Sequence, residues 1–209
     1  MTMRSDFIQY GCGLSAPAGW RNFDASPTLR LQRIPIVGWL IARHRVEFPA
    51  NVEFGDVTRG LPVADMTCDA VYCSHVLEHL SLEDARRALR ETFRILKPGG
   101  TFRGVLPDLE IMIRQYVADP SSDAAIQFMR STILGMGSRP RGIKGILADH
   151  FGNSRHLWMW DYKGLAHELS DAGFRDIRRA RHGDNPSPRF IEIEDEDRWR
   201  DCLGFECRR

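Results

Sequence analysis

The feature that most constrains the fold is a regular alternation of short apolar runs with longer runs at helical spacing. The short runs, which are typical of strands, span residues 7–10, 20–24, 51–55, 70–73, 101–106, 174–180 and 203–207. The longer runs, which are typical of helices, span residues 28–45, 82–97 and 162–172. This alternation predicts an α/β fold in which helices cover a mostly parallel sheet. The length of 209 residues fits a single domain, residues 1–209.

The helix predicted over residues 82–97 has the clearest signals at both ends. Ser81 is placed to cap its N-terminus, and Glu83 and Asp84 fall in the first turn. Apolar residues recur along it at helical spacing, at Leu82, Ala85, Leu89, Phe93 and Leu96. The Pro-Gly-Gly sequence at 98–100 is expected to end the helix before the next strand begins.

Charge and cysteine content exclude several classes of protein. Lys plus Arg number 29 and Asp plus Glu number 28, a net charge of +1 without a basic stripe, so no nucleic-acid partner is expected. The five cysteines form no CxxC pair, which indicates a reduced, intracellular protein. The N-terminus has no apolar signal segment, and the longest apolar stretch, 34–42, is about half a membrane span. We therefore expect a cytoplasmic protein.

Two charged stretches have simple interpretations. Residues 30–45 combine arginines with apolar side chains, and we expect a helix that covers the sheet, with a membrane-surface helix as the less favoured alternative. The acidic run at 192–197 is expected to be a solvated turn before the last strand.

Glycines or polar residues follow four successive predicted strands. They are Gly11, Cys12 and Gly13, then Asp24, then Asp56, and finally Ser74 and His75. Glycine lets the backbone approach a ligand closely, and a carboxylate at a strand end can accept both hydroxyls of a ribose. Taken singly, the glycines can be a turn and Asp24 a cap or turn residue. Together, these residues predict one continuous binding cleft at the carboxyl edge of the sheet.

Several strings of residues also carry a resemblance to a known family. They are residues 11–13 (GCG), Asp24, 55–56 (GD), 69–79 (DAVYCSHVLEH), 93–101 (FRILKPGGT), 156–161 (HLWMWD) and 172–174 (AGF). These strings resemble class I S-adenosylmethionine-dependent methyltransferases, and most closely the type 11 group of small bacterial methyltransferases. The resemblance implies a Rossmann-like sheet in the order 3-2-1-4-5-7-6 with the last strand antiparallel, and it implies residues 109–160 as a substrate-covering insertion.

The same resemblance implies the cofactor S-adenosylmethionine and assigns residues to it. The assigned residues are Tyr10, Gly11, Cys12 and Gly13 beside the methionine part, Asp24 on the ribose, Asp56 and Val57 at the adenine, and Cys73 and Ser74 near the sulfonium.

The sequence departs from the family pattern near its start. Gln9 stands where an acid is usual, and Ser15 stands where a third glycine is usual. Only ten residues separate Gly13 from Asp24, which is too short for a helix and a strand. We therefore expect the first helix to be shortened or absent.

Residues 75–79 (HVLEH) also spell the H-x-x-E-H signature of one class of zinc peptidases. That interpretation is disfavoured, because the string follows a strand and Ser81 starts a new helix directly after it. A divalent ion held by Glu78 and His79 is a weaker alternative. We expect no metal, and a structural role for His79 as a hydrogen-bonding residue beneath the sheet edge.

Three residues are candidates for catalysis: His75, His150 and Asp108. A neutral imidazole can accept a proton from an acceptor hydroxyl, although His75 can equally shape the pocket and Asp108 can equally cap a helix. His156 is a competing base, and Trp158 and Trp160 are expected either to wall the substrate site or to lie in the core.

The predicted function is methyl transfer from S-adenosylmethionine to a small acceptor, with O-methylation of a sugar as the first expectation. The alternative is a methyltransferase fold without activity that serves as a binding or assembly module, which the departures at Gln9 and Ser15 favour.

Overall fold

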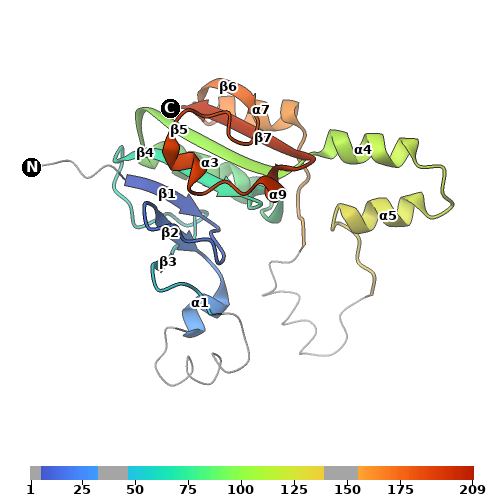
Figure 1. Cartoon of the computed structure of the whole chain (residues 1–209), viewed down its shortest axis with the longest axis horizontal. Coiled ribbons are helices and arrows are strands. Elements are labelled where there is room, and N and C mark those ends of the chain that lie inside the picture. Colours follow the sequence, from blue (N-terminus) through green and yellow to red (C-terminus); the bar gives the residue numbers. More distant parts are fainter. Residues whose placement is uncertain (1–5, 33–46, 139–154) are drawn as a thin grey trace, which may run out of the picture.

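The computed structural model describes residues 6–32, 47–138 and 155–209, and its centre is a seven-stranded sheet in the order β3-β2-β1-β4-β5-β7-β6 (Figure 1). The strands are β1 (Asp6–Tyr10), β2 (Arg21–Asp24), β3 (Val52–Phe54), β4 (Cys68–Ser74), β5 (Leu96–Pro107), β6 (Arg175–Ala180) and β7 (Cys202–Arg208). β7 is antiparallel to both of its neighbours, whereas β1 to β5 pair in parallel. The predicted fold class, strand order and antiparallel last strand are confirmed.

The pairing register brings the ends of the central strands to one edge. Tyr10 of β1 pairs with Phe23 of β2 and with Cys73 of β4, and Cys73 pairs with Gly104 of β5. The residues that follow these strands therefore lie side by side at the carboxyl edge, where ligands bind in open parallel sheets.

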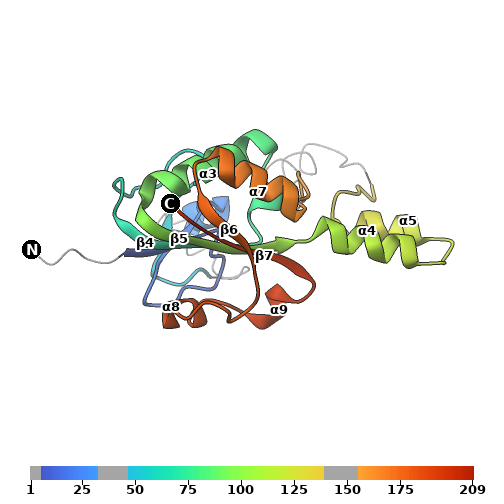
Figure 2. The same ribbon diagram turned by 90° about the horizontal axis from the view of Figure 1, so that it is seen from above.

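One face of the sheet is covered by α3 (Leu82–Ile95) and α7 (Tyr162–Asp171) (Figure 2). Their apolar stripes pack on the larger core, which includes Ile8, Leu89 and Leu165. The Ser81 hydroxyl accepts a hydrogen bond from the Asp84 backbone, which confirms the predicted N-cap.

The end of α3 differs from the prediction. The helix stops at Ile95, and β5 begins at Leu96, so the Pro-Gly-Gly sequence lies inside the strand. The reason is pairing with distant parts of the chain. Leu96 pairs with Cys68 of β4, the Gly99 backbone donates to the Arg209 carbonyl, and the Arg209 backbone donates to the Gly100 carbonyl.

The opposite face of the sheet is covered by the short helices α8 (Pro188–Ile191) and α9 (Glu196–Trp199). The connection between β1 and β2 contains no helix, as predicted. An aromatic cluster takes the place of that helix: the Trp20 ring lies 5.7 Å from Phe190 and 6.4 Å from Tyr72.

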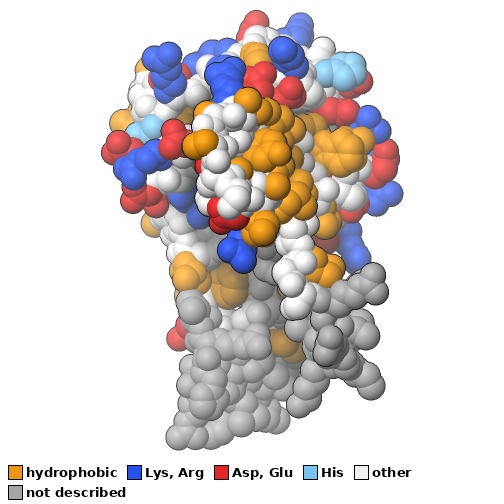
Figure 3. Space-filling model, turned by 90° about the vertical axis from the view of Figure 1, so that its right-hand side faces the viewer, with side chains coloured by type: hydrophobic (Ala, Val, Ile, Leu, Met, Phe, Trp, Pro, Cys, Tyr) orange, Lys and Arg blue, Asp and Glu red, His pale blue; other side chains and the backbone are white. Residues whose placement is uncertain are grey.

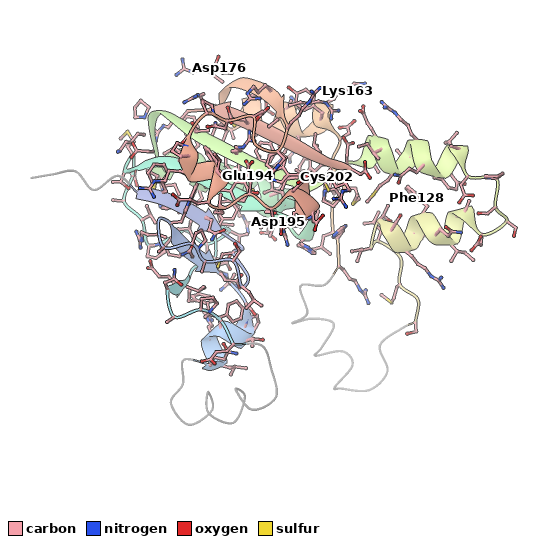
Figure 4. The ribbon with its side chains drawn as sticks, in the orientation of Figure 1. Phe128, Lys163, Asp176, Glu194, Asp195 and Cys202 are labelled. Atoms are coloured by element: carbon pink, nitrogen blue, oxygen red, sulfur yellow. The ribbon has the colours of Figure 1, made fainter. Side chains whose placement is uncertain are left out.

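The same face holds a buried cluster of charges around Arg103, a fully buried residue in the middle of β5. Its guanidinium binds the carboxylates of Glu194, Asp184 and Glu206, and it lies 4.7 Å from the Trp199 ring centroid. Figure 4 labels Glu194, which lies between α8 and α9. The predicted solvated turn at 192–197 is correct for the exposed acids at 192 and 195–197, of which the last two begin α9, but it fails at Glu194, whose side chain is drawn inward by this arginine.

The remaining described helices lie beside the sheet. α1 (Pro27–Gln32) is the described part of the helix predicted over 28–45; residues 33–46 lie outside the described residues. α4 (Leu109–Ala118) and α5 (Ala124–Ser131) form a hairpin that extends from the carboxyl end of β5 (Figure 1). Figure 3 looks toward this hairpin and shows apolar side chains gathered on it, while Figure 4 labels Phe128, whose ring lies 5.3 Å from Tyr116.

None of the helices that the structure describes has the length and apolar character needed to cross a membrane.

Candidate functional site

The site begins at the turn after β1, where two glycines have positive φ. Gly11 has a φ of 64°, and a Cβ placed there would lie 2.3 Å from Cγ2 of Val76. Gly13 has a φ of 53°, and a Cβ placed there would meet no described atom within 4 Å. Gly11 is thus explained by packing against Val76, whereas Gly13 borders open space that a ligand can fill.

No helix lies between this loop and β2, and the buried side-chain amides of Gln9 and Asn22 fix its position instead. The Gln9 amide donates hydrogen bonds of 2.6 Å to the Ser15 carbonyl and to Oδ1 of Asn22. The Asn22 amide in turn donates to the carbonyls of Pro17 and Trp20. The departure at Gln9 therefore has a structural explanation: an acid at this position could not donate these bonds.

Asp24 lies at the end of β2, directly beside the loop. Its Oδ2 accepts a hydrogen bond of 2.9 Å from the Gly13 backbone, and its Oδ1 accepts one of 2.7 Å from the Ser26 backbone. A carboxylate oxygen has more than one acceptor site, so Asp24 can receive ligand hydroxyls while it holds the loop.

Asp56 and Val57 follow β3. Asp56 accepts from the backbone and hydroxyl of Thr58 and lies 3.3 Å from the Arg59 guanidinium, which makes it a turn residue. Val57 is buried against the larger core, and it also lines a cavity of about 310 Å³ with Gly60 and several arginines of α3.

Tyr10 and Cys73 do not offer their side chains to the edge. The Tyr10 hydroxyl accepts a hydrogen bond from Thr92 of α3, and both side chains are buried in the larger core. Burial raises the pKa of the Cys73 thiol to about 12. The side chain of Cys73 thus faces the core rather than the edge, and the assignment of Cys73 to the cofactor stays a prediction. Cys12 is also buried. Burial, and to a smaller extent the negative charge of Asp24, raises the pKa of its thiol to about 12.

Ser74 and His75 lie at the end of β4 and are both engaged by Arg198 of α9. The Arg198 guanidinium donates to Oγ of Ser74 at 2.7 Å, and its carbonyl lies 3.0 Å from Nε2 of His75. Nδ1 of His75 lies 3.2 Å from Oε1 of Glu78. Burial lowers the pKa of His75, but its contacts with Cys202, Glu78 and the Arg198 carbonyl outweigh this and raise the pKa to about 10. His75 therefore has the properties of a positioned cation rather than of a free base.

Asp108 follows β5 and caps α4. Its Oδ1 accepts from the Glu110 backbone at 2.8 Å and its Oδ2 from the Arg179 guanidinium at 3.1 Å. The structure thus shows Asp108 as the N-cap of α4, which is the alternative role predicted for it from the sequence. His150, the third candidate for catalysis, lies outside the described residues.

The two tryptophans differ in burial, and the predicted core role holds for Trp160. Trp160 is buried and donates from its indole to the Leu77 carbonyl, whereas Trp158 is 42% exposed. The backbones of Leu157 and Trp158 both donate to the Glu78 carbonyl. This contact brings the segment before α7 against the one-turn helix η1 (Leu77–His79) that follows β4.

Sequence reasoning missed Val76, Arg198 and Arg103 as residues that shape this region. The only signal for Arg103 is a charge inside an otherwise apolar strand, and Arg198 lies far along the chain from the residues that it contacts.

Comparison with known proteins agrees with this fold. Residues 36–103 match the family model described as "Methyltransferase domain". The chain is similar in structure to a methyltransferase of Thermotoga maritima described as S-adenosylmethionine-dependent and as a possible histamine N-methyltransferase. The TM-score is 0.50 and the identity 16%, over 97% of this chain and 81% of that chain.

It is also similar to the structure described as PigF with SAH. The TM-score is 0.50 and the identity 15%, over 98% of this chain and 50% of that chain. Among curated proteins, none matches the chain. The match over residues 36–103 and the seven-stranded sheet with its antiparallel last strand lead to one conclusion: this chain has the fold of class I S-adenosylmethionine-dependent methyltransferases.

Proposed function

We propose that the protein transfers the methyl group of S-adenosylmethionine to a small-molecule acceptor. The observation that carries this proposal is the open space at Gly13, directly beside the Asp24 carboxylate at the carboxyl edge of the sheet. The residues present fit the cofactor, because a glycine that borders open space gives a ligand close access to the backbone, and the carboxylate keeps acceptor sites for ribose hydroxyls.

The chain's contribution is to bind and orient. Gln9 and Asn22 fix the loop, Gly13 leaves room for the methionine part, and Asp24 receives the ribose. When bound, the cofactor supplies an electrophilic methyl group. Because the transfer is an in-line displacement, positioning of the acceptor supplies most of what the protein must add.

For the acceptor we propose a hydroxyl, with a sugar as the first class to test. The support is the resemblance of the sequence to the type 11 group. Neither His75 nor Asp108 is free to act as the base, since the ring nitrogens of His75 and the carboxylate oxygens of Asp108 are already engaged. Methylation of an oxygen therefore needs another way to activate the hydroxyl.

We also keep cytoplasmic location as a proposal. All five cysteines lie in the described residues, and none of them forms a disulfide, which supports a reducing compartment.

The second candidate function is an inactive fold that serves as a binding module. The observation that favours it is that both carboxylate oxygens of Asp24 accept backbone hydrogen bonds from within the chain. The two candidates differ in one measurable property, which is affinity for S-adenosylmethionine.

A matched pair of glycine variants tests the site. Gly13→Ala places a methyl group in the proposed cofactor space, and Gly99→Ala introduces the same strain elsewhere, since Gly99 also has a positive φ and no described atom within 4 Å of its Cβ position. By calorimetry, Gly13→Ala should lose at least about tenfold in affinity for S-adenosylhomocysteine, and Gly99→Ala should keep the wild-type affinity. Equal affinities of the two variants would remove Gly13 from the site.

Asp24→Ala gives a second, independent measurement. Loss of charge-assisted hydrogen bonds to the ribose should weaken binding by about 1–2 kcal/mol. Because Asp24 also holds the loop, the thermal stability of the Asp24→Ala variant is measured alongside its affinity. Unchanged affinity in a folded variant would refute the ribose role.

A further inference from the structure

Three potential metal ligands converge just beyond the end of β4. They are Glu78 and His79 of η1 and His156, which lies before α7, and one ligand atom from each lies within 4.8 Å of the others. The rings of His79 and His156 meet edge to face, with centroids 4.9 Å apart. These residues are far apart in sequence, and the backbone bonds from Leu157 and Trp158 to the Glu78 carbonyl hold them together.

Two of the three residues in this cluster, Glu78 and His156, bury polar atoms that have no hydrogen-bond partner in the described part of the chain. Glu78 is 1% exposed and His156 is 7% exposed. Oε1 of Glu78 has an ion pair of 3.2 Å with Nδ1 of His75 but no hydrogen bond. Oε2 of Glu78 and Nδ1 of His156 have no hydrogen-bond partner within the described part of the chain. A buried carboxylate and a buried imidazole nitrogen left in this state are costly, so their retention needs an explanation.

The ring of His79 is oriented by the backbone. Nδ1 of His79 lies 2.9 Å from the Arg155 carbonyl, so Nε2 is the nitrogen with which His79 would bind an ion. Metal-binding histidines commonly donate their second nitrogen to a carbonyl in this way, because it fixes the ring and the tautomer.

We propose that Glu78, His79 and His156 bind a divalent transition-metal ion. Two imidazoles and one carboxylate favour ions such as Zn²⁺ or Co²⁺ over Mg²⁺, which prefers oxygen ligands. With metal–ligand bonds of about 2.1 Å, small side-chain rotations close the present spacing. The proposal reverses the expectation from the sequence that no metal is bound, because the contact of η1 with His156 could not be read from the sequence.

Three protein ligands leave an open coordination position, as in catalytic metal sites. The position of the cluster beside His75, at the end of β4, suits a hydroxyl oxygen of the methyl acceptor. A bound ion lowers the pKa of such a hydroxyl, which supplies the activation that His75 and Asp108 do not offer. This assignment of the open position rests on the proposed function, whereas metal binding itself does not.

The test is calorimetric titration of the untagged, chelator-treated full chain with ZnCl₂, CoCl₂ and MgCl₂. We expect one Zn²⁺ or Co²⁺ per chain and weaker binding of Mg²⁺. Glu78→Gln and His156→Gln should each lower the affinity for Zn²⁺ at least tenfold. His167→Gln is the matched control, since His167 lies on α7 with a side chain that is 71% exposed, and it should bind as the wild type does.

The visible absorption of bound Co²⁺ gives a readout on the wild-type chain alone, in case a variant fails to fold. Bands of nitrogen-ligated Co²⁺ at one equivalent support the site. Absence of stoichiometric binding, or equal affinities of the three variants, overturns it. Titration with S-adenosylhomocysteine in the same samples separates the two proposals: metal binding without cofactor binding would contradict only the proposed function.

Discussion

The two faces of the sheet are stabilised in different ways. α3 and α7 cover one face with aliphatic side chains that recur at helical spacing, and these side chains form an apolar core with the sheet. The opposite face is covered by short helices, an aromatic cluster around Trp20 and the buried charges around Arg103. The first face depends on the burial of apolar area, and the second also depends on satisfied polar groups.

This contrast shows how the chain is stabilised without a helix between β1 and β2. The segment between β6 and β7 supplies Phe190 and Trp199 in its place, and Arg103 ties that segment to β5 through Glu194. A polar cluster of this kind is specific but vulnerable, because each partner left unpaired carries a full desolvation cost.

The largest effect should come from Arg103→Ala. It leaves three carboxylates without their buried cation and should cost about 3–5 kcal/mol of unfolding free energy. Urea denaturation measures the change. A loss below about 1 kcal/mol would show that the second face does not depend on this cluster.

Leu89→Ala breaks the apolar face instead. Leu89 is 1% exposed, and the cavity left by its truncation should cost about 2–4 kcal/mol. This loss should be the same at pH 4 and pH 7, since no charge is involved. A strong dependence of the loss on pH would contradict the contrast between the two faces.

Asp184→Asn weakens the polar face at its edge. Burial raises the pKa of Asp184, but hydrogen bonds from Arg178, the Arg181 backbone and Arg103 outweigh it and lower the pKa to about 2. The folded pKa lies below the unfolded value, so this carboxylate stabilises the fold above about pH 4, and the stabilisation is lost as pH falls toward 2. The variant should lose about 1–2 kcal/mol at pH 7 and converge with the wild type near pH 2. If the difference in unfolding free energy between the variant and the wild type did not change with pH across this range, ionisation of Asp184 would not contribute to the stability of this face.

Ser81→Ala should have the smallest effect. It removes the N-cap of α3, which accepts from the Asp84 backbone, and should cost about 1 kcal/mol in thermal or urea unfolding. Ser121→Ala, in the exposed turn before α5, is a control that should change stability little. A loss for Ser81→Ala no greater than that of the control would show that α3 does not rely on its cap.

The fold was largely predictable, because its signals are local. Strand runs, the cap at Ser81 and the short span between Gly13 and Asp24 each follow from neighbouring residues. The start of β5 was not, since Gly99 and Gly100 pair with Arg209, a contact between distant parts of the chain.

The site was predictable in position but not in side-chain roles. The strand ends do meet at one edge, yet Cys73 points into the core and Arg198 engages His75. Which face a residue takes, and what packs on it from the far end of the chain, depends on tertiary contacts that spacing does not encode. For the same reason, the proximity of Glu78 and His156 could not be predicted from the sequence.

The most direct test of the account is calorimetric titration of the wild-type chain with S-adenosylmethionine and S-adenosylhomocysteine. We predict micromolar binding of both at one site per chain, since the loop at Gly13 and the carboxylate of Asp24 are held ready by buried hydrogen bonds. No binding of either at millimolar concentration would contradict the proposed function and favour a methyltransferase fold used as a binding module.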